Sequence, residues 1–401
     1  MLAFLLAPIY LLFNFYIMRW TIWWMSACTH HFKKKWIRAV SLILYLFLCT
    51  SILTAFLLPK GTLKFWMSQL GNYWLGTFLY ILLTVIIVDL IRVILKRMKC
   101  IDQKKLASRK LFVANGTICI AVIISLTAYG ITNAHHIRTT SYDVNVEKDC
   151  DGTASLNIVL AADLHLGYNI GEWHMKKMVE KINRLHPDIV CIAGDIFDNE
   201  YDAIQSPEET AATLAQIKSR YGVYACYGNH DIDEKILAGF TFHKKGKKMS
   251  DPRMDEFLKN AGITLLKDET VLVDDKFYLT GRADYERPGR GITTRMTPEE
   301  ITAGMDLSKP VIVIDHEPRE MDALSSAGVD LDLCGHTHDG QMFPGNLTIN
   351  LLWDNPYGYK TYGKMQQIVT SGVGVFGPYM RVGTKSEIVQ ITVDFQSPDL
   401  K

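Results

Sequence analysis

The sequence lacks the cysteine spacing of a disulfide scaffold or a zinc knuckle. Its eight cysteines include no close pair such as C-x-x-C, and most lie inside apolar runs, so we interpret them as small buried residues. No RNA- or DNA-binding motif accompanies the 43 Lys and Arg residues, so we expect no nucleic-acid partner. The aromatic content of 11% excludes a disordered chain.

Acidic residues are scarce in the first third of the chain, because almost all Asp and Glu lie after Tyr142. The same third is crowded with Leu, Ile, Phe, Trp and Tyr. The net charge of +1 therefore averages two regions of different chemistry and says nothing about partners. We predict a transmembrane region over residues 1–134, a linker and first strand over 135–154, and a soluble domain over 155–401.

Four apolar stretches of 17 to 23 residues are long enough to cross a membrane: Leu2 to Met18, Val40 to Leu58, Tyr73 to Leu95 and Leu111 to Ile131. A hydrocarbon core about 30 Å thick needs about 20 helical residues, and backbone groups in lipid must be paired within the segment. The first stretch has no basic segment before it and no small-residue cleavage site, so we interpret it as a span rather than a signal peptide. The sequence thus predicts four transmembrane helices.

The basic residues are unevenly distributed over the loops between these spans. Twelve Lys and Arg lie in the first and third loops or at the adjoining end of a span, against two in the second loop: Lys33, Lys34, Lys35, Arg38, Arg92, Lys96, Arg97, Lys99, Lys104, Lys105, Arg109 and Lys110, against Lys60 and Lys64. Cytoplasmic loops carry an excess of Lys and Arg. We therefore expect a multi-pass integral protein of the cell membrane with its soluble domain outside the cytoplasm.

Two ionisable residues, Asp89 and Arg92, lie near the inner end of the third span. Intramembrane charges can mark a transported ion or substrate. We favour a simpler interpretation, in which the two side chains, three residues apart, neutralise each other close to the interface.

The second part of the chain alternates short apolar runs with amphipathic stretches, which is typical of an α/β domain. Five runs are followed by side chains that can bind metals. Ligands of open α/β sheets bind at the carboxyl ends of strands, so these side chains should converge. They are Asp163 and His165, Asp195, Asn229 and His230, His316, and His336 and His338.

Imidazole and carboxylate groups suit manganese, iron and zinc, and the absence of Cys at these positions argues against a closed structural zinc site. Seven ligands drawn from these eight side chains are too many for one catalytic ion with open positions. They fit two ions about 3.5 to 4 Å apart, which clamp a phosphoryl group and activate a bridging water as the nucleophile.

The same residues resemble the blocks of the calcineurin-like metallophosphoesterases, which are D-x-H, G-D-x-x-D, G-N-H-D, an isolated His, and G-H-x-H. All five blocks occur in order, at Asp163 and His165, Asp195 and Asp198, Asn229, His230 and Asp231, His316, and His336 and His338. The resemblance covers about residues 155 to 395. The flanking sequence is similar to the membrane-associated YaeI/YkuE-like branch of that family, which includes a vertebrate transmembrane member.

The resemblance implies a four-layer α/β fold, with two packed β-sheets between outer helices, and two divalent ions that are manganese, iron or zinc. It implies that Asp195 bridges the two ions. It also implies that His230 contacts the substrate while Asp198 orients the His230 imidazole. The first ion would be held by Asp163, His165 and His338, and the second by Asn229, His316 and His336.

We therefore expect a membrane-anchored, metal-dependent phosphoric ester hydrolase. The domain follows a span closely, and the segment Leu237 to Arg253 carries Phe240, Phe242 and several Lys, which could rest on membrane lipids or form a solvated loop. Both features favour a phosphodiester or lipid-linked phosphate outside the cytoplasm over a soluble metabolite. The alternatives are a lipid or nucleotide-sugar diphosphate hydrolase, and a non-catalytic membrane sensor that binds phosphate.

Overall fold

A computed structural model describes residues 2–99, 102–237, 240–242, 249–287 and 294–396. The chain divides into two compact units. One contains residues 1–132, 236–242 and 377–380, and the other contains residues 133–235, 243–376 and 381–401.

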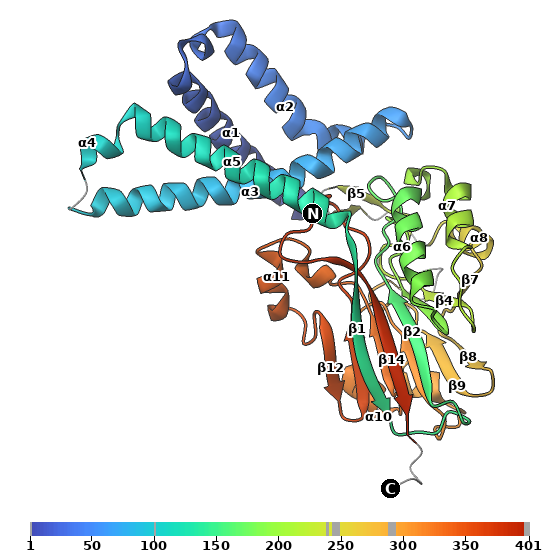
Figure 1. The fold of residues 1–401 in the computed structure, drawn as a ribbon. Coiled ribbons are helices and arrows are strands. Elements are labelled where there is room, and N and C mark those ends of the chain that lie inside the picture. The colour runs from blue at the N-terminus through green and yellow to red at the C-terminus, as the bar shows by residue number, and fades with distance from the viewer. Residues whose placement is uncertain (1, 100–101, 238–239, 243–248, 288–293, 397–401) are drawn as a thin grey trace. The chain divides into compact units, whose positions relative to one another are not determined.

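Most of the first unit is helical (Figure 1). Its helices are α1 (Leu2–Cys28), η1 (His30–Lys33), α2 (Lys35–Leu57), α3 (Thr62–Arg97), α4 (Gln103–Leu106) and α5 (Arg109–Ala134). Within the described residues, α2, α3 and α5 are long and apolar enough to cross a membrane. The predicted first span lies within α1, which has 27 residues, and its crossing of a membrane stays a prediction. The predicted third span is only part of α3, which has 36 residues.

Polar side chains join the first three long helices. The Tyr10 hydroxyl donates to the carbonyl oxygen of Cys49 at 2.7 Å, and the Trp74 indole donates to the Tyr10 hydroxyl at 2.9 Å. The Tyr45 hydroxyl donates to Asn14 Oδ1 at 2.9 Å. Since lipid tails are as apolar as the helix surfaces, such interhelical hydrogen bonds help specify how the helices associate.

The second unit contains two mixed six-stranded sheets. The first has the order β1-β14-β2-β3-β4-β7, and the second has the order β12-β13-β11-β10-β9-β8. The first consists of β1 (Ile137–Val146), β14 (Ser386–Phe395), β2 (Ser155–Ala161), β3 (Ile189–Ala193), β4 (Val223–Cys226) and β7 (Ile263–Leu265). The second consists of β12 (Gly358–Tyr362), β13 (Met365–Val369), β11 (Leu331–Cys334), β10 (Val311–Ile314), β9 (Phe277–Gly281) and β8 (Glu269–Val273).

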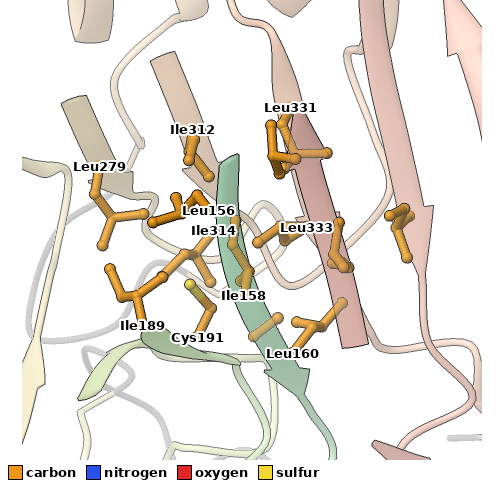
Figure 2. Close-up of a cluster of buried hydrophobic side chains, with 14 of the residues drawn as sticks. Leu156, Ile158, Leu160, Ile189, Cys191, Leu279, Ile312, Ile314, Leu331 and Leu333 are labelled. Carbon is orange, nitrogen blue, oxygen red and sulfur yellow. The ribbon is translucent and has the colours of Figure 1, made fainter. Parts of the chain in front are cut away.

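The two sheets share one apolar core (Figure 2). Leu156, Ile158 and Ile189 of the first sheet and Ile312 and Leu331 of the second belong to the same buried cluster. Within β2 the burial is almost continuous from Leu156 to Ala161, as expected for a central strand covered on both faces. This packing fixes the positions of the strand ends that carry the predicted ligands.

Helices flank the sheets, as the predicted layered fold requires. They are α6 (Glu172–Arg184), α7 (Pro207–Leu214), α8 (Pro252–Asn260), α9 (Pro298–Thr302), α10 (Met321–Ser326) and α11 (Gly345–Thr348), with the short turns η2 (Tyr201–Ala203), η3 (His338–Gly340) and η4 (Ile349–Leu351). Ile301 of α9 and Leu324 of α10 pack with Val311 and Val313 of β10 in a second buried cluster. Successive residues of β10 belong alternately to these two clusters, which shows that both faces of the strand are covered.

A two-stranded ribbon of β5 (Lys235–Leu237) and β6 (Phe240–Phe242) completes the strands. The predicted lipid-contacting segment Leu237 to Arg253 begins here. Its lysines lie within residues 243–248, outside the described residues, so its role stays a prediction.

Candidate metal centre

The predicted ligands lie in the loops that follow five parallel strands. Strands β2, β3 and β4 are parallel neighbours in the first sheet, and β10 and β11 are parallel neighbours in the second. Parallel strands end at the same edge of a sheet, so the loops that follow them meet there. Asp163 follows β2, Asp195 follows β3, and His316 follows β10.

Five of the seven predicted ligands adopt the left-handed backbone conformation, with φ between 48° and 74°: Asp163, His165, Asp195, His336 and His338. Residues with a Cβ rarely adopt this conformation, which costs on the order of 1 kcal/mol or more and concentrates at functional sites. Tertiary packing therefore holds these loops against a local preference.

Three side chains form a first group of buried donor atoms. Ligand atoms of Asp163, His165 and His338 lie within 4.8 Å of one another. The two Nε2 atoms of His165 and His338 are 3.0 Å apart, and His338 Nε2 is 3.7 Å from Asp163 Oδ1. Nitrogen lone pairs and a carboxylate that converge in this way can share a cation.

A second group lies around Asn229. Its Oδ1 atom is 3.0 Å from His316 Nε2 and 3.0 Å from His336 Nδ1, and these two nitrogens are 3.2 Å apart. His316 Nδ1 lies 2.9 Å from the carbonyl oxygen of Ala193. Because a carbonyl only accepts, Nδ1 carries the proton, which leaves the Nε2 lone pair directed into the group.

Asp195 lies between the two groups. Its Oδ2 atom is 3.7 Å from His165 Nε2 and 3.2 Å from His316 Nε2. Its Oδ1 atom accepts a hydrogen bond from the His230 amide at 2.7 Å. One carboxylate oxygen thus anchors the Gly228 to His230 loop, and the other faces both donor groups.

Burial sets the ionisation of this cluster. It raises the pKa of Asp163 to about 6, and it lowers the pKa of both His336 and His338 well below the usual range. His336 and His338 are therefore neutral, as metal ligands must be. Burial also opposes the charged form of His165 and His316, but the neighbouring carboxylates outweigh it and raise the pKa of both rings. The buried carboxylates of Asp163 and Asp195 thus favour positive charge within the cluster, and a divalent cation would supply it. The donor set thus fits divalent metal ions.

The structure corrects the expected partner of His230. Its Nδ1 atom lies 2.5 Å from Oδ1 of Asn199, and the Asn199 amide donates to the carbonyl oxygen of Ile232 at 2.9 Å. Asp198, which the resemblance implied in this place, has Oδ1 3.7 Å from His165 Nδ1 instead. Neither of those two atoms has a hydrogen bond within the described part of the chain.

His230 is buried, and this burial lowers its pKa to about 4. Because Asn199 Oδ1 can only accept, Nδ1 of His230 carries the proton of the neutral ring. The other nitrogen, Nε2, is then the atom that can take up a further proton and transfer it.

Two supporting residues received no role from sequence. Asp231 accepts hydrogen bonds from the amides of Phe197 and Gly228 at 2.8 and 2.7 Å, and so joins the loops after β3 and β4. Its position as the last residue of the G-N-H-D block was the feature of the sequence that could have indicated this role. Arg381 is fully buried and has Nη2 3.1 Å from His338 Nδ1. For Arg381, the only indication in the sequence was its position in the Gly-rich segment near the end of the chain.

Aromatic rings lie beside both donor groups. Between centroids, the Phe376 ring is 5.6 Å from the His165 ring of the first group and 4.5 Å from the His230 ring. The Trp353 ring is 5.0 Å from the His336 ring of the second group. The Arg319 guanidinium stacks 4.5 Å from the Trp353 ring centroid. An apolar and cationic surface therefore adjoins the metal centre.

Two sheets with buried Asp, Asn and His side chains at their strand ends are typical of a metal-dependent hydrolase domain. A family model described as calcineurin-like phosphoesterase matches residues 156–340. A transmembrane protein with metallophosphoesterase domain from Danio rerio is 30% identical over 346 residues, which cover 82% of this chain and 74% of that protein. The chain belongs to the calcineurin-like phosphoesterase family.

Two bacterial relatives extend this comparison. An uncharacterized metallophosphoesterase from Campylobacter jejuni is 26% identical over 353 residues, 87% of each chain. UDP-2,3-diacylglucosamine pyrophosphatase LpxG from Chlamydia trachomatis is 22% identical over 259 residues, 56% of this chain and 76% of that protein. The family implies a phosphoric ester hydrolase, and the three apolar helices with the transmembrane relatives indicate a membrane protein.

Proposed function

We propose that this protein is a membrane-anchored phosphodiesterase that uses two divalent ions to hydrolyse a lipid-linked or envelope phosphate. The position of Asp195 carries this proposal, because one carboxylate oxygen faces both donor groups at 3.7 and 3.2 Å. A shared carboxylate is what a two-ion site requires. The predicted ligands divide accordingly, with Asp163, His165 and His338 on one side of Asp195 and Asn229, His316 and His336 on the other.

Two bound divalent ions stabilise charge on a phosphoryl group and lower the pKa of water. The chain's own residues position the reactants. Asn199 orients His230, whose Nε2 transfers a proton to the leaving oxygen of the substrate. Asp198, near His165 Nδ1, orients a ligand imidazole rather than the His230 ring.

Two features support a lipid-linked substrate. Only residues 135–136 separate α5 from β1, so the domain is tethered close to the end of an apolar helix. The large side chains of Leu347, Leu351 and Leu352 are 62%, 83% and 77% exposed. Leu351 and Leu352 directly precede Trp353, whose ring lies 5.0 Å from the His336 ring. Exposed apolar side chains beside a catalytic site suit a substrate with acyl chains.

The proposed topology is multi-pass with the domain outside the cytoplasm. The basic residues before α2 and those between α3 and α5 lie on one side of the membrane, whether or not α1 crosses it. The chain after α5 then lies on the other side. Fluorescent protein fused after Lys401 should be dark in a bacterial host and alkaline phosphatase fused there should be active. The reverse result would place the domain in the cytoplasm.

The name of one relative, a diacylglucosamine pyrophosphatase, favours a second candidate function. The same donor groups would suit hydrolysis of a lipid or nucleotide-sugar diphosphate, in which the bond broken joins two phosphoryl groups.

The decisive experiment compares bis(p-nitrophenyl) phosphate with p-nitrophenyl phosphate. The full-length protein is purified in detergent, stripped with chelator and reloaded with manganese, iron or zinc. We expect faster hydrolysis of the diester, dependent on metal and absent in His336→Ala. Preference for the monoester would reject the diesterase proposal. Hydrolysis of a diphosphate alone would select the second candidate, and two bound ions without hydrolysis of any ester would indicate a sensor.

A further inference from the structure

A cavity of about 400 Å³ lies within the helical unit, between α1, α3, α4 and α5. Its walls are mainly apolar and include Phe112 and Ile118. Four polar side chains also line it: Asp89, Arg92, Arg109 and Asn115. The cavity therefore combines an apolar wall with two guanidinium groups and one carboxylate.

The expected ion pair between Asp89 and Arg92 does not form. The Asp89 carboxylate accepts a hydrogen bond from Tyr16 of α1. Arg109 donates to the carbonyl oxygen of Ala27 at 2.6 Å, which joins α5 to α1. Within the described residues Arg92 has neither an ion pair nor a hydrogen bond, although it lines the cavity.

The two guanidinium groups lie at the level of the chain's basic loop, because Arg92 is in the last turns of α3 and Arg109 begins α5. This is the depth at which a helix bundle meets lipid headgroups. Guanidinium groups bind phosphate through paired hydrogen bonds, and basic pockets between membrane helices bind phospholipid headgroups. A cation at this depth that has no hydrogen bond or ion pair to the described part of the chain favours an anion from the lipid.

We propose that this cavity binds the phosphate of a glycerophospholipid at Arg92 and Arg109, with an acyl chain along Phe112 and Ile118. The exposed apolar side of α5 continues the path for that chain, since Val122 and Ile124 are 42% and 62% exposed. None of the residues that line the cavity is a predicted metal ligand, so its occupancy does not depend on hydrolysis.

Thermal unfolding of the full-length protein in detergent micelles tests this site. Delipidated protein is titrated with palmitoyl-oleoyl phosphatidylglycerol, and separately with dioleoylglycerol and inorganic phosphate. We expect the phospholipid to raise Tm and to be retained in native mass spectra, and the phosphate-free lipid to do neither. An equal rise with inorganic phosphate would indicate a free anion and overturn a lipid site.

Matched variants separate a specific site from general attraction to anionic lipid. Arg92→Gln should lose more than half of the rise in Tm and most of the retained lipid. Arg97→Gln, on the last turn of the same helix and outside the cavity lining, should keep both. Equal losses in the two variants would overturn the proposal, as would an unchanged response in Arg92→Gln.

A second variant acts on shape rather than charge. Ile118→Trp fills the apolar wall of the cavity from an exposed position, where Ile118 is 61% exposed, so folding should be preserved. This variant should lower lipid retention, although the charged residues of the cavity are unchanged. Full retention by this variant would show that the lipid binds elsewhere on the helices.

Discussion

Nδ1 of the His230 ring lies 2.5 Å from Oδ1 of Asn199, a side chain 31 positions earlier in the chain. Because Asn199 Oδ1 only accepts, this hydrogen bond fixes the orientation of the His230 ring and keeps the proton of the neutral ring on Nδ1. Asn199 is itself fully buried and bonded to the carbonyl oxygen of Ile232. We therefore infer that Asn199 is a positioning residue for the proton transfer assigned to His230.

Asn199→Ala should lower kcat for bis(p-nitrophenyl) phosphate by about 10- to 100-fold, with little change in KM, because general acid catalysis contributes about 10²- to 10⁴-fold and depends on orientation. Metal content should be unchanged. Asn199→Asp should restore part of the rate. The added carboxylate favours the charged imidazolium, so it should move the limb of the pH profile set by His230 to higher pH. An unshifted pH profile in Asn199→Asp would contradict the positioning role of Asn199.

The division of ligands around Asp195 predicts how metal content responds to substitution. Asn229→Ala or His336→Ala should leave about one ion per chain, because each removes a ligand from one group only. Asp195→Ala should lower the content of both sites. Elemental analysis after dialysis measures this, and His186→Ala, an exposed histidine, is the control. Loss of all metal in Asn229→Ala would contradict two separable sites.

Burial of His174 predicts a pH dependence of stability. Its Nε2 atom lies 3.0 Å from the carbonyl oxygen of Val373, and burial lowers its pKa to about 4. Between about pH 6.5 and pH 4 the unfolded chain binds a proton that the folded chain does not. The contribution of His174 to the free energy of unfolding should therefore fall as pH decreases through this window, by up to about 1.4 kcal/mol per pH unit, and level off below it. Buried carboxylates such as Asp231, whose pKa burial raises to about 7, contribute in the opposite sense.

His174→Gln should reduce this slope, since glutamine does not titrate, while His186→Gln should keep it. Thermal unfolding of the full-length protein at several pH values between about 4 and 7 provides the comparison. Equal slopes in the wild type and in His174→Gln would show that His174 does not contribute.

The exposed leucines beside Trp353 predict a difference between soluble and lipid substrates. The double change Leu351→Ser and Leu352→Ser should lower kcat/KM for a fluorescent phosphodiester lipid in vesicles several-fold. It should leave bis(p-nitrophenyl) phosphate unaffected, because neither leucine is a predicted ligand. Leu272→Ser and Leu307→Ser, also partly exposed, serve as the matched control. Equal losses for both substrates would indicate damage to the fold rather than loss of a lipid contact.

Sequence alone located the predicted ligands, because each follows a short apolar run and parallel strands deliver their carboxyl ends to one edge. It also identified apolar segments long enough to cross a membrane, since hydropathy and length are local properties. The beginning of α3 at Thr62 was not anticipated, because apolar residues such as Leu63 and Trp66 extend the helix beyond the predicted span.

Tertiary structure decided which polar groups meet. Asp198 and Asn199 are neighbours in sequence, and only the turn after β3 determines that Asn199 reaches His230 while Asp198 faces His165. Similarly, Tyr16 reaches Asp89 from another helix, so the local Asp89 and Arg92 pair predicted from spacing does not form. The local sequence pattern determines which residues lie at the end of a strand or on a helix. The residues that their side chains contact depend on how distant segments of the chain pack.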